Sequence, residues 1–218
     1  MEENEQVMSD EIREEVEWCN IRWFDGADTG KRVLLIGDSI TLGYGNVVCE
    51  KLKEKQIHTA WLCTSKSIDN PSLRKEIEYA MSEYPVELIH FNNGLHGWHL
   101  NETTYADALE KMLVWIKETY PMCKLVFATT TQSVRSEYEH EQIQKRNKNG
   151  VNTCREVKKF ALIRLQSLTI QPVNFDRWCS LSSWRLSDSW KCGGRVYLPP
   201  DRIGAVILRS DSISIVTR

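Results

Sequence analysis

The sequence predicts a three-layer α/β/α fold whose central sheet is mostly parallel. Short apolar runs, typical of buried strands, alternate along the chain with longer segments whose apolar residues have helical spacing. Each apolar run also breaks into a polar or glycine-containing segment, as a strand does where it leaves the carboxyl edge of a parallel sheet. Right-handed crossovers between parallel strands then place helices on both faces of the sheet.

Composition indicates a globular protein of one domain. The 218 residues are 41% hydrophobic and 27% charged, and the net charge of −2 gives no electrostatic reason to expect nucleic acid or an anionic membrane as a partner. No apolar run reaches the length of a membrane span, and the acidic N-terminus lacks the features of a secretory signal. We therefore expect a cytoplasmic protein without nucleic-acid or membrane partners. Its oligomeric state does not follow from the sequence.

The cysteines give no sign of a metal site or a redox pair. Seven are scattered along the chain, and no two form a C-x-x-C arrangement. Free thiols in a reducing compartment are the expected state, and we expect neither a metal nor a cofactor.

The chain begins with a charged stretch. Residues 1–17 are acidic, and we expect a solvated helix or a frayed tail there, outside a single domain that spans 18–218. Trp18, Trp23 and Phe24 then supply aromatic side chains that we assign to the core.

The segment 32–45, RVLLIGDSITLGYG, is the most informative part of the chain. Its apolar run 33–36 is typical of a strand buried on both faces, and the run ends at a glycine that permits a sharp turn. Asp38 and Ser39 follow, and both are good N-cap residues for a helix. The Ser39 hydroxyl would then lie at a helix N-terminus on the carboxyl edge of the sheet, the environment that a serine nucleophile needs. A role as a helix cap alone is the alternative for so short a motif.

The other elements follow from the same patterns. Further strands are expected at 58–63, 86–92 and 124–129. Helices are expected at 46–55, 72–84, 102–120 and 152–168, with a charged surface segment at 137–148. Short strands are expected near the C-terminus at 173–175, 206–208 and 213–216.

Three loops are expected at the same edge of the sheet as Ser39. The loop after the second strand carries Ser65 and Ser67 as candidate substrate contacts. The loop after the fourth strand carries Arg135, which would meet a polar or acidic substrate or remain solvated. The loop after the third strand lies in IHFNNGLHGWH, and it brings Asn93, Gly94, His96, Trp98 and His99 to this edge. For the two histidines, an ordinary place in a loop is the alternative.

Four segments of the chain resemble the SGNH (GDSL-type) hydrolases. They are RVLLIGDSI, CTSKSIDNP, IHFNNGLHGWHL and KLVFATTTQSVR, which occur in the order of that family and at about its spacing, over roughly residues 17–160. The resemblance implies a flavodoxin-like three-layer fold of the SGNH hydrolase type. It also implies that Ser39, in the GDS motif with Asp38, is the nucleophile of an esterase.

The resemblance further implies an oxyanion hole. Its donors would be the backbone amides of Ser39, of the loop 64–68 and of Gly94, helped by Asn93 or His96. Gly94 matches the glycine of the family's G-x-N-D block, and His96 stands at the asparagine. A shift in register would instead make Asn92 or Asn93 the side-chain donor. A neutral histidine donates one hydrogen bond, as the asparagine amide does. The loop 64–68 departs from the family because it lacks the glycine usual there.

The family's late Asp-x-x-His block, whose histidine deprotonates the serine, is not found in this chain. The nearest similar segment, 201–204, has glycine in place of the histidine. His96, His99 and His140 follow expected strands at the active edge and are the candidate substitutes. From about residue 162 the helical periodicity is also lost. Either the C-terminal region has diverged, or its reading frame has shifted.

We therefore expect an SGNH-type esterase that hydrolyses short-chain acyl esters and is impaired by the missing histidine. The resemblance suggests O-acetyl groups on carbohydrates as one class of substrate. The alternative is a non-catalytic protein on the same fold that binds a carbohydrate or acyl ligand through Trp98, His99 and Arg135. A functional base distinguishes the two.

Overall fold

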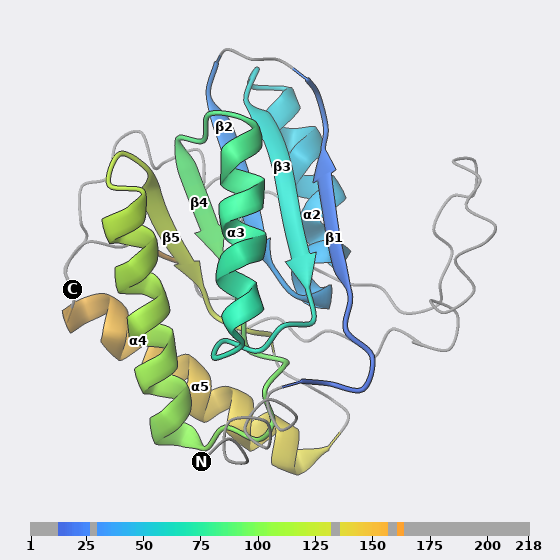
Figure 1. The fold of residues 1–218 in the computed structure, drawn as a ribbon. Coiled ribbons are helices and arrows are strands. Elements are labelled where there is room, and N and C mark those ends of the chain that lie inside the picture. The colour runs from blue at the N-terminus through green and yellow to red at the C-terminus, as the bar shows by residue number, and fades with distance from the viewer. Residues whose placement is uncertain (1–12, 27–29, 132–135, 157–160, 164–218) are drawn as a thin grey trace, which may run out of the picture.

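The computed structural model describes residues 13–26, 30–131, 136–156 and 161–163. A six-stranded sheet forms the centre of the molecule (Figure 1). Its strands are β1 (Cys19–Trp23), β2 (Arg32–Gly37), β3 (His58–Thr64), β4 (Leu88–Phe91), β5 (Lys124–Ala128) and β6 (Ala161–Ile163). Their order is β1-β3-β2-β4-β5-β6, and only β1 runs antiparallel to its neighbour. The prediction of a mostly parallel sheet is confirmed.

Helices cover both faces of this sheet. They are α2 (Ser39–Lys53), α3 (Pro71–Glu83), α4 (Glu102–Thr119) and α5 (Glu137–Glu156). Side chains alternate along β2, so that Leu34 and Ile36 pack in one core cluster with residues of α3 and α4. Val33 and Leu35 pack in a second cluster with α2 on the opposite face. This arrangement confirms the three-layer α/β/α fold.

The order of the parallel strands positions the candidate site. From β2 the chain passes through α2 to β3 on one side of β2. From β3 it passes through α3 to β4 on the other side of β2, so the direction of winding reverses at β2. Open α/β sheets of this order bind ligands at the carboxyl ends of the strands where the reversal occurs. Ser39 follows β2 and the loop 92–97 follows β4, so both lie at this point.

Two predicted elements differ from the structure near the N-terminus. α2 is one helix, although we expect a separate helix at 46–55, because Gly43 and Gly45 do not interrupt it. Gly45 has a packing reason, since a Cβ atom there would lie 2.6 Å from a ring carbon of Trp61 on β3. The strand patterns also miss β1, an edge strand with several exposed residues that lacks a clear apolar alternation.

The prediction of a helix over 152–168 is wrong. α5 instead includes the charged segment 137–148 and ends at Glu156, and Ala161–Ile163 forms β6 beside β5. A short apolar run fits a helix or a strand equally well, and pairing with β5 decides in favour of the strand. The strands expected at 173–175, 206–208 and 213–216 lie outside the described residues. No helix in the described parts of the chain is long and apolar enough to span a membrane.

Candidate active site

Ser39 is the first residue of α2 and directly follows the sharp turn that ends β2. The turn requires glycine at position 37, because a Cβ atom there would lie 2.0 Å from the hydroxyl oxygen of Thr41. Asp38 caps the helix, and its Oδ1 accepts a 2.8 Å hydrogen bond from the amide of Ile40. The half-buried Ser39 side chain therefore lies at the positive end of the helix dipole.

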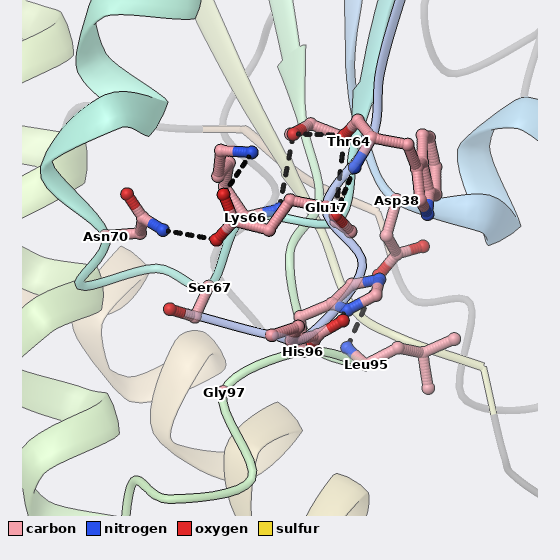
Figure 2. Close-up of polar contacts among 12 residues, drawn as sticks. Glu17, Asp38, Thr64, Lys66, Ser67, Asn70, Leu95, His96 and Gly97 are labelled. Atoms are coloured by element: carbon pink, nitrogen blue, oxygen red, sulfur yellow. Dashed lines mark hydrogen bonds and ion pairs between the residues drawn. The ribbon is translucent and has the colours of Figure 1, made fainter. Parts of the chain in front are cut away.

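Asp38 also connects this turn to the loop after β4. Its Oδ2 accepts a 3.3 Å hydrogen bond from the amide of Leu95, and the amide of Gly94 hydrogen-bonds the same carboxyl group. Burial raises the pKa of Asp38, and the nearby His96 and the backbone amides oppose that rise. The carboxyl group thus fixes the distance between the Ser39 turn and the loop 92–97 (Figure 2).

The amide side chains of the loop after β4 hold the backbone around the site. Asn92 donates to the carbonyl oxygen of Ala128 at 2.8 Å, and Asn93 donates to that of Lys66 at 2.9 Å. Gly94 packs so closely against Thr130 that a Cβ atom would lie 1.9 Å from the threonine hydroxyl oxygen. The residues 92–94 therefore connect the loops that follow β3, β4 and β5.

Arg146 of α5 supports the same loop, and the sequence patterns do not predict this role. Its side chain is 3% exposed, and its guanidinium lies 4.8 Å from the ring centre of Trp98 and 4.7 Å from that of Tyr105. It donates hydrogen bonds to the carbonyl oxygens of Gly94 (3.1 Å), His96 (2.9 Å), Gly97 (2.6 Å) and Leu100 (3.5 Å).

A helical pattern would have found Arg146. Within α5, Ile143, Val151 and Cys154 are buried, and their spacing marks one face of a helix. Arg146 lies on that face, three residues after Ile143, whereas most of the charged residues around it are exposed. An arginine on an apolar face requires buried acceptors, and the loop carbonyls supply them.

His96 binds the chain segment that precedes β1. Its Nδ1 lies 2.7 Å from Oε1 of Glu14, and its ring packs edge to face against Trp18 with 6.4 Å between ring centres. Its Nε2 is buried and has no hydrogen-bond partner among the described residues. The imidazole therefore has one nitrogen bound to a carboxylate and one available.

The segment 14–18 lies over the loops that follow β3 and β4 (Figure 2). Glu17 forms a 2.8 Å ion pair with Lys66 and accepts a 3.1 Å hydrogen bond from Asn70. The backbone of Trp18 exchanges hydrogen bonds with Ser65, whose amide donates to the Trp18 carbonyl oxygen at 3.0 Å. The end of the acidic stretch 1–17, where we expect a solvated helix or a frayed tail, thus contacts the predicted site.

The predicted substrate contacts fall into two groups. Ser65 hydrogen-bonds the carbonyl oxygen of Trp18. Ser67 and His99 both hydrogen-bond the carboxylate of Asp69, at 2.6 and 2.8 Å. Trp98 and His99 line an open pocket of about 360 Å³, which also includes Leu100, Asn101, Glu102, Tyr138, Gln142 and Lys145. Arg135 lies outside the described residues.

Comparisons with known proteins agree with this architecture. No known family profile and no curated protein matches the sequence. A GDSL-like lipase from Bacteroides thetaiotaomicron has a similar structure, with a TM-score of 0.56 and 14% identity, over 84% of this chain and 90% of that chain. A protein of Parabacteroides merdae assigned as a GDSL-like lipase gives 0.53 and 18%, over 82% and 94%. This protein therefore shares its fold with these two proteins, which agrees with the resemblance of the four sequence segments.

Proposed function

We propose that this protein is a serine esterase of the SGNH type that hydrolyses short-chain acyl esters with Ser39 as its nucleophile. The position of Ser39 carries the proposal. It is the first residue of α2, at the carboxyl end of the central strand β2 and at the reversal of strand order. The fold shared with GDSL-like lipases supports this choice of chemistry.

In the proposed reaction, the Ser39 oxygen attacks the ester carbonyl, and the alcohol leaves to give an acyl-enzyme that water hydrolyses. The amide of Ser39, at the start of α2, is positioned to stabilise the oxyanion. The Gly94 amide hydrogen-bonds Asp38, and Asn93 donates to Lys66, so these groups position the loop. We therefore assign Asp38, Asn93 and Gly94 to positioning.

The pocket beside Trp98 favours a carbohydrate as the alcohol part of the ester. Trp98 follows His96 by two residues on the same loop, and the pocket combines Tyr138, which is 61% exposed, with the polar side chains of Gln142 and Lys145. Aromatic faces flanked by hydrogen-bonding groups suit a sugar ring. The same pocket favours the second candidate function, a non-catalytic protein that binds a carbohydrate ligand there.

Hydrolysis of 4-nitrophenyl acetate by the parent protein and by Ser39→Ala tests the proposal. We expect the parent to turn over and Ser39→Ala to lose activity by a factor on the order of 1,000 or more. Equal rates for the two folded proteins would contradict the esterase and leave the binding protein. In that case, Trp98→Ala should weaken binding of an acetylated oligosaccharide.

A further inference from the structure

A serine esterase requires a base for its serine, and the five histidines of the chain are all within the described residues. His58 begins β3 at the opposite edge of the sheet and pairs with Asp25 at 2.8 Å. His90 is fully buried, with its Nε2 3.1 Å from the Tyr44 hydroxyl. The Nε2 atoms of His99 and His140 are engaged with Asp69 and Gln144. Each of these four rings thus has one nitrogen in a polar contact with another side chain.

His96 shares with His58 and His99 a carboxylate contact at one ring nitrogen, but its second nitrogen is buried, and its loop contacts the turn that carries Ser39. Its Nδ1 lies 2.7 Å from the Glu14 carboxylate, which only accepts hydrogen bonds, so a neutral ring carries its proton on Nδ1. Its Nε2 then holds the lone pair, and that atom is buried without a partner among the described residues. A carboxylate on one nitrogen and a free second nitrogen is the arrangement of a histidine base.

The backbone brings His96 to the turn that carries Ser39. The amide of Leu95, which directly precedes His96, donates to the carboxylate of Asp38, which directly precedes Ser39. The imidazole lies near enough to Asp38 to act on that carboxylate electrostatically, and Figure 2 shows the ring beside it. The carbonyl group of His96 is in turn held by Arg146 at 2.9 Å. The ring therefore occupies a fixed place at the edge of the candidate site.

We infer that His96 is the general base for Ser39 and that Glu14, from the segment before β1, is the positioning residue that fixes its tautomer. This inference rests on the proposed function and supplies the base that the C-terminal sequence lacks. The two residues lie 82 positions apart, and both precede the C-terminal region in which the family has its Asp-x-x-His block. The pair of His96 and Glu14 would supply the base and its carboxylate partner from residues that precede the usual C-terminal block.

The proton balance of the inferred step is complete. The Ser39 hydroxyl transfers its proton to Nε2 of His96 as its oxygen bonds to the ester carbonyl carbon. The ester C–O bond then breaks, and Nε2 returns the proton to the departing alcohol. Water attacks the acyl-enzyme and gives its proton to Nε2, and the Ser39 oxygen recovers that proton as the acid leaves. Glu14 accepts the Nδ1–H bond throughout and stabilises the imidazolium.

The decisive experiment compares four variants of the full chain with the parent on 4-nitrophenyl acetate. His96→Asn keeps a hydrogen-bond donor but has no basic nitrogen, and should lower kcat/KM by about 100-fold or more. Glu14→Gln should lower kcat by about 10-fold. Glu15→Gln, the same change at the adjacent exposed residue, should leave kcat unchanged. His96→Ala should recover part of its activity when imidazole is added, which a purely structural role would not allow.

The outcomes separate this inference from the proposed function. If Ser39→Ala loses activity while His96→Asn keeps it, His96 acts only as a donor, and the inference fails although the esterase stands. A gain of activity in Glu14→Gln would also overturn the inference, because Glu14 would then be obstructing the site. If the parent is no more active than Ser39→Ala, the proposed function and the inference fail together.

Discussion

The guanidinium of Arg146 donates a 2.6 Å hydrogen bond to the carbonyl oxygen of Gly97, although the two residues lie 49 positions apart. This contact joins α5 to the loop after β4, which hydrogen-bonds Asp38 next to Ser39 in the chain. The Arg146 side chain is buried and donates hydrogen bonds to several carbonyl oxygens of this loop. The geometry of the candidate site therefore depends on α5, which lies outside the site.

Replacement of Arg146 should loosen the loop. Arg146→Met leaves the loop carbonyls without donors, which should cost about 2–4 kcal/mol in the free energy of unfolding. Arg146→Lys keeps the charge but not the planar fork, and should recover only part of this loss. Urea denaturation measures both variants, with Lys148→Met, an exposed change on the same helix, as the control. Equal stability of Arg146→Met and the control would show that the hydrogen bonds from Arg146 to the loop carbonyls do not stabilise the protein.

Gly94 should not tolerate a side chain. Gly94→Ala places a Cβ atom 1.9 Å from the hydroxyl oxygen of Thr130, and the resulting shift should cost about 1–3 kcal/mol. The double variant Gly94→Ala, Thr130→Ala should be less destabilised than the sum of the two single variants, because the clash is then partly removed. Thermal unfolding of the three variants tests the coupling. Strict additivity would mean that the loop relaxes without Thr130.

The ion pair of Glu17 with Lys66 should hold the segment 14–18 against the site. Both side chains are largely buried, and Lys66 keeps a longer contact of 3.7 Å to Glu76 when Glu17 is removed. Glu17→Ala should therefore cost about 1–3 kcal/mol, less than the complete breaking of a buried pair. It should also expose the peptide bonds near Arg13 to trypsin. Unchanged proteolysis in Glu17→Ala would show that the segment is held by other contacts.

His90 should make the protein less stable in mild acid. Burial lowers its pKa from 6.5 to about 4, so between these two values the unfolded chain binds a proton that the folded protein does not. Stability should then fall as the pH decreases from about 6.5 toward 4, by on the order of 3 kcal/mol for this residue. Urea denaturation of the parent and of His90→Gln across this range isolates the effect. The same pH dependence in both proteins would contradict the attribution of this loss of stability to His90.

The sequence predicts the layers of this fold well, because buried strands and amphipathic helices carry strong periodic signals. The strand at 33–36 and the helix N-terminus at Asp38 and Ser39 appear where the patterns place them. The patterns fail for β1, where exposed edge residues replace the apolar alternation, and for β6, where a short run fits two kinds of element.

The candidate site is less predictable, because its supports come from distant parts of the chain. Ser39 and His96 follow strands and are recognisable from motifs. Glu14 and Arg146 lie in charged segments that give no sign of their partners 82 and 50 positions away. Only the folded chain shows that one carboxylate reaches an imidazole and that one guanidinium is buried among carbonyls.

The central claim is that Ser39 is an activated nucleophile. The most direct test is to treat the folded parent protein with a fluorophosphonate, a reagent that modifies activated serines, and to map the adduct by peptide mass spectrometry. We predict one stoichiometric adduct, on the peptide that contains Ser39, and none in Ser39→Ala. Absence of an adduct on Ser39 in folded protein, or labelling of other serines at the same rate, would contradict the account.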